Sequence, residues 1–311
     1  MTKIFFSVLP VLTLFVLGYL LQRIYFFKER SIGDIKKLVV SIALPCLLFR
    51  AFSQLELQPK FLVVVVLVFG ICGIMLMLGE MLAHALHISS PYFPILLGGF
   101  ETGMLGYAIF IAVYGIDEID KLAIIDLGQV LFVFFVLMAL LMKHRDGAQS
   151  VSQLVKMFLS SPVIISIFLG IFVSLVKGDA DYSTNRMVHF VGQVMTLLGN
   201  LTVPLICLVI GYELKFDFHS ARLSVKTIII RKIFLIAFAL LMNKVVFVRI
   251  LHLEPIYEYA LLAMFLMPPP FVIALFLKEE DQENQQYVVN TLSLSTIVSI
   301  GLFIVISMVY R

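Results

Sequence analysis

The sequence predicts an all-α polytopic membrane protein whose ten transmembrane helices form two inverted five-helix repeats. The first observation is composition: 61% of the 311 residues are hydrophobic and only 14% are charged, whereas soluble domains contain about 25% charged residues. The second is that apolar stretches fill nearly the whole chain. The third is a pair of helix-breaking segments, Glu101–Gly106 and Pro268–Pro270, in matching places of the two halves. These observations exclude a soluble domain.

Each transmembrane helix needs about 20 apolar residues to cross a hydrocarbon layer of roughly 30 Å. The first predicted helix has one Lys before its apolar run and no small-residue cleavage motif, so we expect it to be retained rather than removed as a signal peptide. The ten predicted helices are Ile4–Phe27, Ile35–Phe52, Phe61–Leu86, Tyr92–Tyr114, Ile119–Met142, Met157–Val176, Val188–Tyr212, Val225–Leu251, Ile256–Leu277 and Val288–Tyr310.

The polar stretch Lys143–Ser150 is the clearest linker. It divides the chain into a first five-helix repeat (residues 1–143), a linker (144–150) and a second, inverted repeat (151–311). With the N-terminus outside, fourteen of the 23 Lys and Arg residues lie on the linker's side of the membrane. Cytoplasmic loops are enriched in these residues. We therefore predict a multi-pass protein of the plasma (inner) membrane with both termini outside and the linker in the cytoplasm.

The two halves share landmarks. Leu44–Phe49 matches Val203–Leu208, with Pro204 following Pro45 by 159 residues, and Met267 follows Glu101 by 166. Because five is an odd number of crossings, the second repeat enters the membrane from the opposite side, which gives an inverted-topology repeat. Such symmetry produces two alternating access states.

The paired breaks predict a substrate site at mid-depth in the membrane. Proline inside a helix removes a hydrogen bond and clashes with the preceding turn, so Pro268, Pro269 and Pro270 should unwind the ninth helix. Gly103 and Gly106 should do the same to the fourth. Unpaired backbone groups are costly in hydrocarbon, so the breaks should adjoin a polar cavity. Half-helix N-termini there would attract an anion. The alternative is that each break is a helix kink without a ligand. This alternative could explain a single break, but two breaks in matching places favour a cavity.

Glu101 lies beside the first break, together with Thr102. A charge at the bilayer centre is costly, so Glu101 should face the cavity or carry a proton, and we predict that it couples transport to protons. Asp126, in the fifth helix, is a second candidate for proton coupling; it either pairs with the crossover or caps a polar pocket. Asn290 is predicted to contact substrate. The other polar residues expected to border the cavity, for which interhelical hydrogen bonds are the alternative role, are Gln129, Asn200, Ser295 and Thr296.

Other classes of function lack their signatures. Cys46, Cys72 and Cys207 have neither Cys-x-x-Cys nor Cys/His spacing, so no metal site, disulfide framework or other cofactor is predicted. There is no basic, aromatic-interleaved patch for nucleic acid. An intramembrane enzyme would need a nucleophile and base in reach, and neither Gly-x-Ser-x-Gly nor His-Glu-x-x-His occurs. A channel stays an alternative, although inverted repeats favour alternating access.

At this level of detail the chain resembles the auxin efflux carrier family, which includes bacterial permeases often linked to malate or malonate and the plant PIN auxin exporters. The resemblance covers essentially the whole chain. It rests on Leu44–Phe49, Gly103–Gly106, Val203–Pro204 with Gly211–Leu214, Met267–Pro269, and Ser295–Thr296 with Ser299.

The resemblance implies a fold similar to the bile acid/sodium symporters, with the fourth and ninth helices crossing as broken helices. It also implies elevator movement of helices three to five and eight to ten against a scaffold of helices one, two, six and seven. Pro45 and Pro204 would belong to the scaffold. The implied partners are a small organic solute, protons, membrane lipids and a second copy in a homodimer.

The chain departs from the family pattern at Glu101, where Asn is common, and at Ala108, where Pro is common. Ionised Glu repels an anion, whereas protonated Glu can donate a hydrogen bond to it. We therefore expect a secondary active transporter of a small organic anion, such as a dicarboxylate or an auxin-like acid, with Glu101 carrying a proton. The alternative is a cationic or zwitterionic solute with Glu101 as its counter-charge.

Overall fold

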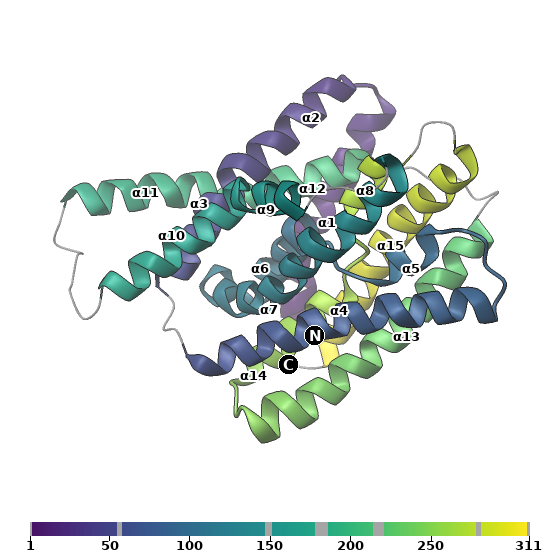
Figure 1. The fold of residues 1–311 in the computed structure, drawn as a ribbon. Coiled ribbons are helices and arrows are strands. Elements are labelled where there is room, and N and C mark those ends of the chain that lie inside the picture. The colour runs from purple at the N-terminus through teal and green to yellow at the C-terminus, as the bar shows by residue number, and fades with distance from the viewer. Residues whose placement is uncertain are drawn as a thin grey trace. The chain divides into compact units, whose positions relative to one another are not determined.

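A computed structural model describes residues 2–54, 58–146, 151–177, 186–213, 221–277 and 281–309 (Figure 1). Within these ranges the chain forms helices joined by short non-helical segments. Seven of the described helices are long and apolar enough to cross a membrane, and the pair Ser152–Leu159 and Pro162–Val176, bent by 65°, would make an eighth crossing. An all-helical polytopic membrane protein is thus confirmed. The ten-helix inverted repeat stays a prediction. Linker residues 147–150 and two of the counted cations, Lys215 and Lys278, lie outside the described residues.

The chain divides into two compact units, and each unit takes residues from both halves of the sequence. Unit 1 contains residues 1–59, 103–123 and 156–214, and unit 2 contains residues 60–102, 124–155 and 215–311. The division therefore runs through the predicted fourth and fifth helices. It does not test the repeat in the sequence.

Unit 1 is organised around two helix clusters. In one, α12 packs against α1, α2 and α6; in the other, α3 packs against α10 and α11 (Figure 1). Pro45 is the second residue of α3 and lies two residues after the π-helical turn η1. Because proline has no N–H, it fits a place where the regular hydrogen-bond ladder is interrupted. The elements are α1 (Thr2–Arg23), α2 (Glu29–Leu38), η1 (Val39–Ala43), α3 (Leu44–Ser53), η2 (Thr102–Gly106), α6 (Tyr107–Tyr114), η3 (Ile116–Glu118), α10 (Pro162–Lys177), α11 (Arg186–Asn200) and α12 (Thr202–Glu213).

The C-terminal end of α12 holds the connection between α1 and α2. The Tyr212 hydroxyl donates a hydrogen bond of 2.6 Å to the Phe27 carbonyl oxygen. Next to it, Glu213 forms an ion pair of 3.0 Å with Lys36 on α2. The motif around these residues, one of those that carry the family resemblance, thus has a structural role in this unit.

Unit 2 is built on α13, which packs against α14, α15 and α5 (Figure 1). The Thr227 and Tyr287 hydroxyls, 2.7 Å apart, link α13 to α15 inside the unit. Gly128 on α7 brings that helix close to Val65 on α4. The elements are α4 (Pro59–Ala85), α5 (Tyr92–Leu97), η4 (Val133–Leu137), α8 (Met138–Asp146), α13 (Ala221–Met242), η6 (Asn243–Ile250), α14 (Pro255–Leu266), η7 (Phe271–Phe276) and α15 (Gln282–Val309). Both units contain residues of α7 (Ile119–Phe132), α9 (Val151–Leu159) and η2, whose first residue, Thr102, belongs to unit 2.

Two glycines let the α1 and α12 backbones touch. A Cβ at Gly18 on α1 would overlap the Leu208 carbonyl oxygen, and a Cβ at Gly211 on α12 would overlap the Phe15 carbonyl oxygen. Small residues permit this close approach, which stabilises helix pairs in membranes by van der Waals contact.

We predict that Gly211→Ala destabilises unit 1, because the added methyl group must push α1 and α12 apart. Overpacking of this kind costs about 1–3 kcal/mol. The measurement is the apparent melting temperature of the purified protein in detergent. Gly73→Ala on α4 is the matched control, since a Cβ there meets no atom within 4 Å. Equal melting temperatures for the two variants would contradict the prediction.

Candidate functional site

The predicted break in the fourth helix is present, but it begins earlier than expected. The helix α5 ends at Leu97, and residues 98–101 are non-helical. Gly99 has φ +70°, a left-handed conformation that favours glycine, and a Cβ there would lie 2.9 Å from the Pro270 Cγ. The expectation that Gly103 and Gly106 unwind this helix was wrong: both lie in the π-helical turn η2. The left-handed Gly99 interrupts the helix four residues before Gly103.

The ninth helix breaks where the prolines predict. The helix α14 ends at Leu266, Met267 is extended, and helical structure resumes only after Pro270 in the short 3₁₀ helix η7. The two broken spans are also the most enclosed of the seven single spans: in an 18-residue apolar window, 83% of one and 72% of the other is buried, against 28–50% for the other five. Both breaks therefore lie inside protein rather than against lipid, as backbone chemistry requires.

The two breaks contact each other within unit 2 through Glu101, and we call this contact the crossing. Its backbone N–H donates to the Pro268 carbonyl oxygen at 2.9 Å. Its carboxylate Oε2 accepts the backbone N–H of Phe271 at 2.7 Å. Beside this contact the Phe100 and Phe265 rings stack with centroids 4.9 Å apart. The Glu101 carboxylate thus binds a backbone amide at the start of η7, where the sequence predicts that a half-helix N-terminus attracts an anion.

Arg231, on α13, satisfies the carbonyl groups at the break of the fourth helix. Its guanidinium donates to the carbonyl oxygens of Leu96 (3.0 Å), Leu97 (2.5 Å) and Gly99 (2.5 Å). Its Cζ also lies 5.1 Å from the centre of the Phe100 ring, at a distance typical of a cation–π contact. The side chain is completely buried. A positive charge placed at carbonyl groups that end a helix is stabilising.

The next residue, Lys232, does the same for the ninth helix. Its ammonium donates to the carbonyl oxygens of Leu266 and Met267, the latter at 3.1 Å, and to the Ser299 hydroxyl at 2.8 Å. Two consecutive cations on α13 therefore cap the two broken helices, one each. The first half of each broken helix therefore ends at a positively charged side chain of α13.

Sequence reasoning missed this role for Arg231 and Lys232 because it counted both among the inner-side cations. The structure buries them inside unit 2, so they do not contribute to the positive-inside count, which falls from fourteen to twelve. A signal was available. Arg231 lies six residues inside the predicted eighth helix, roughly 9 Å from its start at 1.5 Å per residue, and intramembrane charges generally mark functional interiors.

The other predicted polar residues fall into both units. In unit 2, the Gln129 amide donates to the Phe100 carbonyl oxygen (3.0 Å) and to Asp126 Oδ1 (3.2 Å), so Asp126 is tied to the crossing by one bridging residue. The Thr296 hydroxyl donates to its own helix at Leu292. Thr102, Asn290 and Ser295 are also buried in unit 2, whereas Asn200 lies in unit 1.

Within the described residues, four side-chain oxygen atoms in unit 2 are buried and form no hydrogen bond: Thr102 Oγ1, Gln129 Oε1, Asn243 Oδ1 and Ser295 Oγ. Buried polar atoms are nearly always paired, so such atoms call for a water or a ligand. Thr102 directly follows Glu101 in the chain, and Gln129 donates a hydrogen bond to Phe100, which directly precedes Glu101. Oxygen atoms that can still accept a hydrogen bond therefore lie beside the crossing. The cavity that the sequence predicts there stays a prediction.

Comparison with known proteins identifies the family. Residues 3–310 match the family model described as membrane transport protein. The chain belongs to this family, the auxin efflux carriers. Among similar proteins are two uncharacterized transporters, from Methanothermobacter thermautotrophicus and Methanocaldococcus jannaschii. Both are 25% identical to this chain, over 69% and 67% of its length and 70% and 68% of theirs. The resemblance seen in the sequence is confirmed: this auxin efflux carrier family member is a multi-pass membrane transporter, not a member of an enzyme family.

For this carrier we predict that Arg231→Gln strongly destabilises unit 2. An uncharged amide cannot serve three carbonyl groups, and each buried acceptor left unpaired costs about 1–3 kcal/mol. Arg231→Lys should be intermediate, because an ammonium keeps the charge but lacks the planar fork of the guanidinium. The measurement is the melting temperature and the monodisperse fraction in detergent.

Arg222→Gln is the matched control, since Arg222 is an exposed residue on the same helix. It should leave both quantities unchanged. If Arg231→Gln were as stable as this control, the capping role of Arg231 would be excluded.

Proposed function

We propose that the chain is a secondary active transporter that moves a small organic anion, such as a dicarboxylate or an auxin-like acid, together with a proton carried by Glu101. The observation that carries this proposal is the hydrogen bond between the Glu101 carboxylate and the Phe271 amide at the crossing. The same amide is what a solute carboxylate would bind. Solute and Glu101 would therefore compete for one hydrogen-bond donor.

The buried charges of unit 2 support coupling of the anion to a proton. Four charged side chains of the described residues are buried, all in unit 2: Glu101, Asp126, Arg231 and Lys232. With all four ionised their charges sum to zero. When Glu101 takes up a proton the sum becomes +1, and a bound monoanion returns it to zero. Because uncompensated charge is costly in low dielectric, proton and anion should bind together.

A binding step follows from these contacts. Protonated Glu101 releases the Phe271 N–H and offers its own O–H as a donor. The solute carboxylate then accepts from the Phe271 N–H, and Thr102 next to Glu101 has a hydroxyl oxygen without a partner in the described structure. Gly103, Gly106, Pro268, Pro269, Pro270 and Asn290 remain proposed contributors to the same site, and Asp126 a proposed second proton carrier.

The two units support alternating access of the elevator type. Unit 2 holds the third, eighth, ninth and tenth predicted helices with most of the fifth, and unit 1 holds the first, second, sixth and seventh, including Pro45 and Pro204. Residues 103–123 group with unit 1, so only the first half of the fourth helix would travel with the moving part. We also propose a homodimer in the plasma membrane, with both termini outside and the linker in the cytoplasm.

The competing function is transport of a cationic or zwitterionic solute. The ionised Glu101 carboxylate favours it, because an ammonium group would find a counter-charge there without any proton uptake. A test of function must therefore include the charge of the solute.

We predict that purified protein in proteoliposomes takes up labelled C3 or C4 dicarboxylates or indole-3-acetate when the outside is acidic. If one proton moves with each monoanion, the step is electroneutral and a gradient of one pH unit supports about tenfold accumulation. In Glu101→Gln the proton carrier is absent, so uptake should no longer respond to the pH gradient.

Glu80→Gln is the matched control, since Glu80 is an exposed carboxylate on α4 of the same unit. It should behave as the wild type. Unchanged pH dependence in Glu101→Gln would rule out Glu101 as the proton carrier. Folded protein that transports none of these anions, but does transport a cation or zwitterion, would establish the competing function.

Counterflow separates a carrier from a channel. We predict that unlabelled solute loaded inside the liposomes accelerates entry of labelled solute, because a carrier returns faster when its site is occupied. The measurement is the initial uptake rate with and without internal solute. A rate that does not depend on internal solute would indicate a channel.

A further inference from the structure

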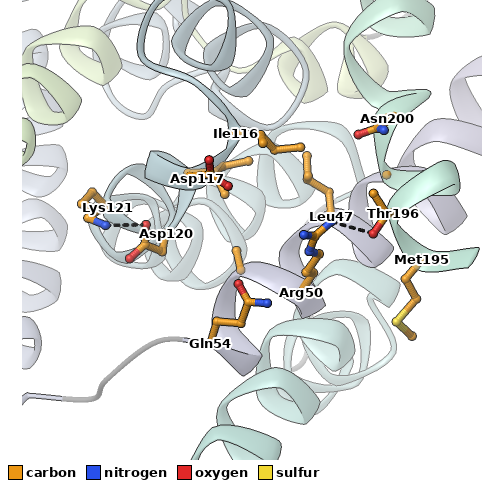
Figure 2. Close-up of a pocket in the computed structure, with 13 residues that line it drawn as sticks. Leu47, Arg50, Gln54, Ile116, Asp117, Asp120, Lys121, Met195, Thr196 and Asn200 are labelled. Atoms are coloured by element: carbon orange, nitrogen blue, oxygen red, sulfur yellow. Dashed lines mark hydrogen bonds and ion pairs between the residues drawn. The ribbon is translucent and has the colours of Figure 1, made fainter. Parts of the chain in front are cut away.

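Unit 1 contains a polar cavity that the transport proposal does not use. It has a volume of about 220 Å³ and lies between α3, α11 and the segment that leads into α7. Figure 2 shows the side chains that line it, with Arg50 and Thr196 on one side and Asp117, Asp120 and Lys121 on the other. All of its lining residues belong to unit 1, whereas the crossing belongs to unit 2.

One wall of the cavity presents a cation. Arg50 is half-buried, and its guanidinium donates a hydrogen bond of 2.6 Å to the Thr196 hydroxyl oxygen. That hydroxyl donates in turn to the Gly192 carbonyl oxygen at 2.8 Å. Within the described ranges no carboxylate forms an ion pair with Arg50. A guanidinium has five N–H donors, so most of its donors stay available to a ligand carboxylate.

The opposite wall presents carboxylates. Asp120 pairs with Lys121 at 3.1 Å, and Lys121 also pairs with Glu118 at 3.3 Å, so this ammonium is already neutralised. Asp117 is exposed and forms no ion pair within the described part of the chain. It is therefore the carboxylate with capacity for an incoming ammonium group.

From this arrangement we infer that the cavity is a second binding site of the protein and that it takes a small zwitterion of the α-amino acid class. The carboxylate of the ligand lies on Arg50, and the ammonium group of the ligand lies toward Asp117. The four charged residues that line the cavity, Arg50, Lys121, Asp117 and Asp120, sum to zero, so a ligand without net charge leaves no uncompensated charge. A simple carboxylate would face Asp117, and a simple amine would face Arg50.

The volume limits the ligand to a small one. About 220 Å³ corresponds to roughly seven water molecules at ~30 Å³ each, and it is below the range of about 300–1,000 Å³ for sites that hold drug-sized molecules. Glycine, alanine and serine have the right size. The amide of Asn200, which also lines the cavity, offers a further donor and acceptor.

The test is calorimetric titration of purified full-length protein in lipid nanodiscs with glycine, L-alanine and L-serine. Propionate and ethylamine are the matched probes, since each is alanine without one of its charges. We expect alanine to bind at least about tenfold more tightly than either, the loss that a single charge-assisted hydrogen bond produces. Arg50→Gln and Asp117→Asn should each weaken alanine binding by a similar factor.

Two control variants test whether the loss of a charge outside the cavity affects binding. They are Arg222→Gln on α13 and Asp34→Asn on α2, both at exposed positions. Both should bind as the wild type does. Glu101→Gln should also keep alanine binding, because that residue belongs to the crossing in unit 2. If Arg50→Gln alters the chromatographic profile, the exposed Asp117→Asn variant decides. The inference is overturned if none of the three amino acids binds, or if propionate or ethylamine binds as tightly as alanine. It is also overturned if Asp117→Asn binds alanine as tightly as the wild type does, or if Glu101→Gln abolishes alanine binding.

Discussion

The need to satisfy backbone groups at two broken helices in the interior of unit 2 is the constraint on which the rest of that unit depends. A membrane interior offers no water to a free carbonyl, so each interruption of a helix must find partners in the protein. Arg231 provides them for the fourth helix, and Lys232 for the ninth. Because these residues are consecutive on α13, one helix determines where both breaks can lie.

This solution brings two positive charges into the core, and the core contains two carboxylates as well. Glu101 and Asp126 are buried in the same unit as the two cations. A buried charge without compensation costs several kcal/mol, so any change in the protonation of one carboxylate alters the affinity of the unit for an ion. Packing of the broken helices and, in the proposed function, the electrostatic preference for a solute therefore depend on the same four residues. The Phe100–Phe265 stack and the Gln129 contact to Phe100 hold these charges in a single arrangement.

Unit 1 has a different character. Its helices approach through glycines, such as Gly18 and Gly211 at the α1–α12 contact, and its described ion pairs lie at partly exposed positions. Among its described residues no charged side chain is buried, and Arg50 and Asp117 lie at a polar cavity instead. In the elevator mechanism proposed above, unit 1 would be the stationary framework, and unit 2, with its charge-rich core, would bind and carry the solute.

The sequence alone determined the membrane class, the family and the location of the ninth-helix break, because hydropathy and proline chemistry act over a few consecutive residues. It also placed Glu101 beside the break of the fourth helix, where the structure has it, because a carboxylate inside an apolar run is unusual wherever the chain folds. It could not establish that the fourth helix breaks at Gly99 rather than at Gly103 and Gly106, because all these glycines permit a break and only the approach of Pro270 selects one. Nor did it assign Arg231 and Lys232, whose carbonyl partners lie more than 30 residues away in the chain. Those assignments needed the tertiary structure, because a capping interaction depends on which helix ends meet in space and not on neighbours in sequence.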